Sequence, residues 1–207
     1  MANRNGTAYD LTLLCPIIAD GDRGQSPVGG LRDYLRRLPR GTESPFCKVT
    51  ATHLARLSII DDIYFQGTTA REDHLHSKYL WFNTNFDGDP VSYLDSMFDA
   101  MPREIGEIWK CCVGFPGVAA GREKWKHYMF RCQIDTTFFF AAVNDMSVDE
   151  MLRGLMLKQE FSVFVAANQG VAAERLQQNF LAFMEDFKKA PTPQRGSVYY
   201  QFDGRGE

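Results

Sequence analysis

The chain has 207 residues, of which 44% are hydrophobic and 13% aromatic, and its formal net charge is −3. This composition is typical of one folded domain, or of one domain with appendages, and it excludes a wholly disordered chain. The sequence contains neither a long basic stripe nor a run of 18 apolar residues, so we expect no nucleic-acid partner and no membrane span.

The first half of the chain predicts a strand, a helix, two strands and a second helix. These segments lie at 9–19, 27–38, 52–60, 78–86 and about 90–101. Each helix begins with an N-cap residue followed by proline at the first helical position, as Ser26–Pro27 and Asp89–Pro90.

The second half predicts further helices around one more strand. In order, we expect helical turns at 104–112, a short helix at 123–131, a strand at 136–143, a helix that starts at the capping box of Ser147 and Glu150, and a helix at about 171–187. Residues 1–190 are expected to form a single domain. Residues 191–207 are expected to be a linker with a loose or edge-strand tail.

This order of elements predicts an α+β fold. A split βαβ arrangement gives a ferredoxin-like four-stranded antiparallel sheet with helices on one face, here with extra C-terminal helices. The other face of the sheet must be covered, either by the extra helices or by the sheet of a second subunit. We therefore expect a homodimer or a hetero-oligomer.

Two of the expected strands carry polar side chains along one face. Side chains alternate between the two faces of a strand, so Arg56 and Ser58 share one face, and Asn83, Asn85 and Asp87 share another. A sheet with one apolar and one polar face has room for a ligand on its polar side. The sequence thus predicts a small-molecule ligand there.

The five cysteines are Cys15, Cys47, Cys111, Cys112 and Cys132. Their number is odd, their spacing is irregular and they include no C-x-x-C pair, which indicates reduced thiols. The polar residues 1–10 do not have the pattern of a secretory signal. We expect a cytoplasmic protein with free thiols.

Three patches of the sequence resemble a poorly characterised bacterial group that carries motifs of the form THFAR, FSTNFDG and HCxGYP. The patches are Thr52-His53-Leu54-Ala55-Arg56, Phe82-Asn83-Thr84-Asn85-Phe86-Asp87-Gly88 and Cys112-Val113-Gly114-Phe115-Pro116. The resemblance covers residues 8–187 at low similarity. It implies a ferredoxin-like fold related to the dimeric α+β barrels, which include haem peroxidases, chlorite-dismutase-like proteins and small monooxygenases.

The resemblance also implies functional positions. The motif positions of the group fall on His53, Arg56, Asn85, Asp87, Cys112 and His127. The chain departs from the group at Cys111, where the motif has histidine.

Arg56 and His53 are the first candidate site residues. Arg56 could orient a carboxylate or a haem propionate, or it could form a buried ion pair with Asp87 or Asp61. His53 could act as an acid or base, or it could be a hydrogen-bonded structural histidine. The two residues are three apart on one strand, so they point to opposite faces unless a bulge intervenes.

Asn85 and His127 complete the candidate site. Asn85 could bind substrate on the open face. Alternatively, the polar row of Asn83, Asn85 and Asp87 could satisfy neighbouring backbone groups at the strand end. His127 is the candidate axial ligand of a haem, with Trp125, Phe138 and Phe140 expected around it. The alternative for His127 is a surface or structural histidine.

No metal site is expected. His74 and His76 lie two apart, which suits ligands on one face of a strand, but no third ligand is evident near them. Cys111 and Cys112 lie near a predicted helix C-terminus, where the dipole acts against a thiolate, so buried thiols are expected.

Two functions remain open. One is a small-molecule enzyme of the α+β barrel type, an oxidoreductase acting on an apolar or aromatic substrate with haem or with no cofactor. The other is a non-catalytic ligand-binding or accessory subunit that pairs with a separate catalytic protein. In the second case, the stripe containing Phe180, Phe183 and Phe187 would form part of a partner surface.

Overall fold

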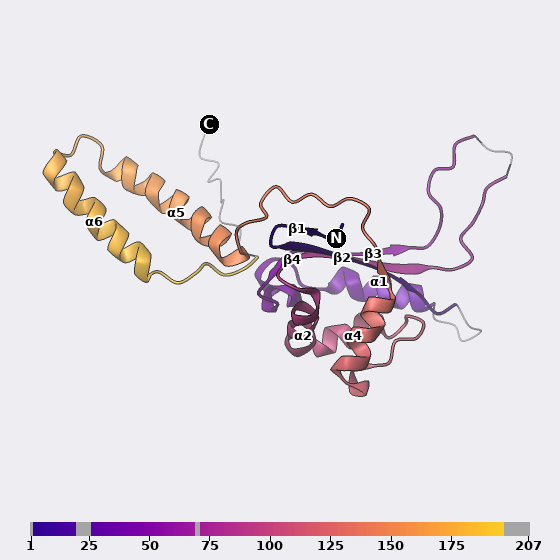
Figure 1. Ribbon diagram of the computed structural model, residues 1–207. Coiled ribbons are helices and arrows are strands. Elements are labelled where there is room, and N and C mark those ends of the chain that lie inside the picture. The colour runs from indigo at the N-terminus through magenta and orange to yellow at the C-terminus, as the bar shows by residue number, and fades with distance from the viewer. Residues whose placement is uncertain (1, 20–25, 69–70, 197–207) are drawn as a thin grey trace.

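The computed structural model describes residues 2–19, 26–68 and 71–196. It is a mixed α+β structure with an open antiparallel sheet and six α-helices in these ranges (Figure 1). The strands are β1 (Arg4–Asn5), β2 (Ala8–Pro16), β3 (Thr52–Ile60), β4 (Tyr79–Asp87) and β5 (Gln133–Ile134). The helices are α1 (Pro27–Arg37), α2 (Pro90–Ala100), α3 (Pro102–Trp109), α4 (Arg122–Arg131), α5 (Val148–Ala167) and α6 (Ala173–Lys189).

Three long strands form the body of the sheet. They lie in the order β2-β4-β3, and every pair is antiparallel. The short strands β1 and β5 both pair with β2 on its other edge. Phe82 of β4 stands opposite Leu13 of β2 and Leu57 of β3, so the three strands present apolar side chains in register on one face.

The core lies between this apolar face and the helices. Helices α1, α2 and α4 lie on one side of the sheet, and the segment between β5 and α5 crosses the other side (Figure 1). Large side chains from β4, α3 and α4 meet in this core, where Phe82, Trp109, Trp125 and Met129 are fully buried. The layer of helices is therefore held by burial of the helix faces that the sequence periodicity predicts.

Two of the predicted helix starts have side-chain caps. The Asp89 carboxylate accepts hydrogen bonds from the backbone N–H groups of Val91 and Ser92, at 3.0 and 2.9 Å. Ser147 and Glu150 form the reciprocal capping box of α5. Ser26 is the N-cap residue of α1 but makes no side-chain cap hydrogen bond.

The prediction of a strand at 136–143 is wrong. Continued antiparallel pairing beyond β5, in which Ile134 lies opposite Thr12, would bring this segment beside the start of β2. The strand β1 already occupies that edge, with Asn5 opposite Ala8. The segment is irregular instead, and Phe138 is 82% exposed.

Helices α5 and α6 form a hairpin that extends away from the sheet and its helices (Figure 1). Aromatic rings hold the two helices together; Phe164, for example, lies 5.1 Å from Phe183 between ring centroids. Neither helix contains a buried residue. The edge strand expected within 197–202 lies outside the described residues. Within the described ranges, no helix is long and apolar enough to cross a membrane.

Candidate functional site

A β-bulge in β3 brings His53 and Arg56 to the same face of the sheet. The pairing with β4 shifts between Thr52 and Leu54, which inserts one extra residue. The Thr52 hydroxyl is hydrogen-bonded beneath the sheet, within the core, whereas the His53 Nε2 atom lies 2.7 Å from the Asp87 carboxylate on the open face. Both candidates therefore lie on the open face, because the bulge offsets the alternation of side chains.

His53 and Asp87 join the sheet to the hairpin. The second oxygen of Asp87 accepts a hydrogen bond from the backbone N–H of Val148, the first residue of α5, at 3.0 Å. The side chains of His53 and Asp87 are only 19% and 18% exposed. This geometry gives His53 a structural hydrogen bond at a junction between elements.

Asn85 belongs to a network around a buried carboxylate. Asp10 of β2 is 7% exposed, and its Oδ1 atom accepts hydrogen bonds from the amides of Asn83 and Asn85, both at 2.7 Å. Its Oδ2 atom accepts from the hydroxyls of Thr12 and Thr136, at 3.1 and 2.9 Å. The polar row of β4 is thus used to hold Asp10 and the segment that crosses the sheet.

Asp10 is a residue of this network that was not among the predicted site residues. The available signal was a carboxylate within a predicted strand, two residues before Thr12 on the same face. A carboxylate in such a position needs donors on the neighbouring strand. Asn83 and Asn85 of β4, which stand opposite Thr12 and Asp10, provide them.

Arg56 is exposed and stacks on an aromatic ring. Its guanidinium carbon lies 5.9 Å from the ring centroid of Trp81. The two expected carboxylate partners are paired elsewhere, since Asp87 contacts His53 and Asp61 contacts Arg32 at 2.5 Å. In the described part of the chain, the expected ion pair of Arg56 is therefore not formed.

A cavity of about 650 Å³ lies at the outer edge of β2. Two backbone hydrogen bonds frame it: Leu14 N–H donates to Cys132 at 2.9 Å, and Val113 N–H donates to Pro16 at 2.7 Å. Its apolar lining comes from β2, from the loop after α3 and from α4. These residues are Leu14, Pro16, Val113, Pro116 and Tyr128.

One face of α4 lines this cavity with basic side chains. Lys124, His127 and Arg131 are spaced three and four residues apart, which places them on one side of a helix. Glu123 is the acidic residue of the lining. Trp125 and Met129 on the opposite side of α4 are fully buried, so packing of the helix against the core turns the basic face toward the cavity.

The prediction that aromatic side chains surround His127 is wrong. Trp125 points into the core, where its ring centroid lies 5.5 Å from that of Phe98. Phe138 and Phe140 are 82% and 69% exposed in the irregular segment and do not line the cavity. His127 itself is exposed, and no hydrogen bond of its imidazole is found among the described residues.

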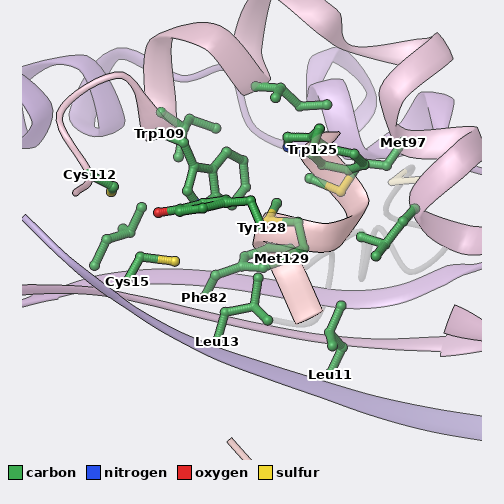
Figure 2. Close-up of a cluster of buried hydrophobic side chains, with 14 of the residues drawn as sticks. Leu11, Leu13, Cys15, Phe82, Met97, Trp109, Cys112, Trp125, Tyr128 and Met129 are labelled. Atoms are coloured by element: carbon green, nitrogen blue, oxygen red, sulfur yellow. The ribbon is translucent and has the colours of Figure 1, made fainter. Parts of the chain in front are cut away.

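Three cysteine side chains, those of Cys15, Cys112 and Cys132, lie next to Tyr128 in the wall of the cavity or behind it. Cys15 and Cys112 are buried next to Tyr128, whose hydroxyl lies on the same side of the core (Figure 2). Hydrogen bonds from Cys112 and then Cys132 lower the pKa of Cys15 despite its burial. The bond to Cys15 and burial raise the pKa of Cys132, which lines the cavity. A neutral thiol is therefore expected at the cavity wall.

In the histidine loop before β4, His74 is paired with a carboxylate. The His74 Nδ1 atom lies 2.9 Å from Asp62, and the hydrogen bond to this carboxylate raises the pKa of His74. Within the described ranges, no group of three histidine, cysteine or acidic side chains is arranged to hold a metal ion.

Comparisons of the chain with protein-family models, with curated proteins and with solved structures find no match.

Proposed function

We propose that the protein binds a small amphipathic anion in the cavity at the edge of β2. The ligand would place a carboxylate, or another anionic group, beside the basic face of α4 and an apolar body against the cavity floor. The observation that carries this proposal is the row of Lys124, His127 and Arg131 above an apolar lining.

The size and lining of the cavity support an apolar body. Ligand pockets commonly have volumes of roughly 300–1,000 Å³ and are mostly apolar with a few polar groups. The cavity of about 650 Å³ lies within this range. Leu14, Val113 and Pro116 can contact a hydrocarbon or aromatic group, whose burial would provide most of the binding free energy.

The charges of the lining support an anionic group. Lys124 and Arg131 bring two basic side chains to the lining, and the carboxylate of Glu123 is paired with Lys126 at 2.9 Å. The Arg131 guanidinium can form two parallel hydrogen bonds to one carboxylate. The positive charge would also attract an anion toward the cavity mouth.

Catalysis is the second candidate function, and His127 is the residue that favours it. An imidazole that lines a substrate cavity can act as a general acid or base. In this proposal the protein is a small-molecule enzyme of the α+β barrel type that acts on an apolar or aromatic substrate. His53 and Asn85 would have no direct part, because both are used in structural hydrogen bonds.

Haem does not fit the residues around His127. The aromatic wall expected for it is absent from the cavity lining, since Trp125 is buried in the core and Phe138 is exposed elsewhere. A metal-bound histidine usually donates its other ring N–H to a carboxylate or carbonyl, and no such partner is found among the described residues. We therefore assign no step to haem.

The proposed fold relationship is to the ferredoxin-like proteins. The order β2-β4-β3 is that of the first three strands of a split βαβ fold, and the two-residue β5 stands beside β2 where a fourth strand would pair. A relationship to dimeric α+β barrels would follow from this topology and from the three motif patches. A role as an accessory subunit remains compatible with it.

The test compares a carboxylate with a neutral ligand of the same chain length. Binding of octanoate and of octanol to the full chain is measured by isothermal titration calorimetry. We expect octanoate to bind more tightly than octanol, and the Lys124→Gln/Arg131→Gln variant to lose this preference through a roughly tenfold weaker affinity for octanoate.

The matched control is Arg36→Gln, which removes an exposed arginine on α1. Its affinity for octanoate should equal that of the wild type. Equal affinity for the acid and the alcohol in the wild type would contradict the proposal, as would a preference that survives in the double variant.

A further inference from the structure

We infer that the α5–α6 hairpin is a homodimerisation element. The distal hairpin, which we define as residues 155–184, would pack against the same segment of a second copy to form an antiparallel four-helix bundle. The inference is independent of the proposed ligand, because the cavity of about 650 Å³ is lined by β2, α4 and the loop after α3.

The two helices of one hairpin already share an aromatic seam. Phe161 and Phe164 of α5 contact Phe183 of α6, with ring centroids 6.2 and 5.1 Å apart, and Phe164 also contacts Phe180. This seam accounts for one apolar side of each helix. It uses the stripe that the periodicity of α6 predicts.

The apolar surface of α5 extends well beyond this seam. In the last turns of α5, residues 161–167, every side chain except Ser162 is apolar, and a helical segment that is apolar all round is normally covered on all sides. Here α5 has no buried residue. Val163 is 62% exposed and Val165 is 41% exposed, while Leu181 on α6 is 58% exposed. The hairpin therefore leaves uncovered apolar surface that a partner can bury.

An apolar groove in the distal hairpin provides a place for side chains of the second copy. It has a volume of about 480 Å³, and Phe161, Val165, Leu176 and Phe180 contribute to its lining. Both long sides of the hairpin lie away from the sheet (Figure 1). A second hairpin can thus approach without meeting the body of the first copy.

The charges of the distal hairpin favour a copy of itself as the partner. Its charged residues are Lys158, Glu160, Glu174 and Arg175, which sum to zero. No side chain is charged in 161–173 or in 176–184. Two such surfaces meet without repulsion. A membrane-surface helix would instead be rich in lysine and arginine on its polar face.

The available area is close to what a stable dimer needs. The α5 part of the distal hairpin is about 20 Å long at 1.5 Å per residue, and two adjacent helices are about 20 Å wide. One face of the distal hairpin therefore has a projected area on the order of 400 Å² per copy. Interdigitated side chains raise the accessible area buried by two copies to on the order of 1,000 Å², about the threshold for a specific interface.

The test is the molar mass of the full chain in solution, measured by sedimentation equilibrium. We expect twice the 23.6 kDa of one chain for the wild type. The Val165→Glu/Leu176→Glu variant, which places two charges on exposed residues of the groove lining, should be monomeric, with a dissociation constant weakened roughly 100-fold or more. Circular dichroism should show an unchanged helix content.

The control variant is Ile63→Glu/Phe65→Glu, which adds the same charge to exposed apolar residues in the connection between β3 and β4. It should remain dimeric. A monomeric wild type would overturn the inference, and so would a dimer that persists in the hairpin variant. Flotation of the wild type with vesicles of phosphatidylcholine and phosphatidylglycerol, abolished by the hairpin substitutions, would assign the surface to a membrane instead and overturn it as well.

Discussion

Asp10 shows how one buried charge organises the open face of the sheet. Its two carboxylate oxygens accept four side-chain hydrogen bonds from two strands and from the segment after β5. Burial of a carboxylate is costly unless donors replace the lost water, and the amides and hydroxyls around it meet that requirement. The network therefore ties the crossing segment to the sheet through Thr136.

Asp10→Ala should destabilise the protein by about 3 kcal/mol, because the amides of Asn83 and Asn85 lose the charged acceptor they share. Urea unfolding followed by circular dichroism measures this change. The control is Asp135→Ala, the removal of an exposed carboxylate one residue from Thr136. A loss of less than 1 kcal/mol for Asp10→Ala would show that the network contributes little net stability.

Helices α5 and α6 illustrate the limits of local signals in an element. The capping box of α5 is formed as its sequence predicts, because Ser147 and Glu150 need only each other and the first turn of the helix. The environment of the same helix is different, since none of its residues is buried. Local chemistry thus determines where α5 begins but says nothing of what covers it.

Ser147→Ala should open the first turn of α5. The Ser147 hydroxyl accepts a hydrogen bond from the backbone N–H of Glu150 at 3.3 Å, and loss of such a cap costs about 1 kcal/mol. Hydrogen–deuterium exchange of the first-turn amides should accelerate roughly fivefold. In Ser162→Ala, an exposed position in the same helix, these rates should stay unchanged. Equal rates in Ser147→Ala and the wild type would contradict a role of this cap.

The molecule as a whole consists of a sheet with its layer of helices and a hairpin attached at one end. Asp87 links the two parts: one oxygen contacts His53 on the neighbouring strand and the other accepts from the N-terminus of α5. A carboxylate is also favoured there by the helix dipole. The position of the hairpin thus depends on a residue at the end of β4.

Asp87→Ala should loosen this attachment. Loss of the hydrogen bonds to the carboxylate should favour local opening by about 2 kcal/mol, which corresponds to a roughly 30-fold increase in cleavage between β5 and α5 during limited proteolysis. Asp62→Ala is the control, because it removes the carboxylate bonded to His74 in a loop away from the hairpin. Unchanged cleavage in Asp87→Ala would show that other contacts hold the hairpin.

Local sequence patterns predicted most of the elements. Periodicity and caps identified β3 at 52–60 and placed the starts of α2 and α5, because these features depend on residues close together in the chain. The same signals failed at 136–143, where consecutive phenylalanines indicated a strand. That segment cannot pair with the edge of β2, because β1, which lies more than 130 residues earlier in the chain, already pairs there.

The candidate sites depended on long-range contacts. The residue pattern and the motif resemblance identified Arg56, Asn85 and His127 as polar groups with possible functions, but they could not assign the partners of these groups. Pairing of β2 with β4 joined Asn85 to Asp10, and packing of α4 on the core turned His127 toward the cavity. Such partners are set by strand register and helix packing, which involve residues distant in the chain and are therefore invisible to local periodicity.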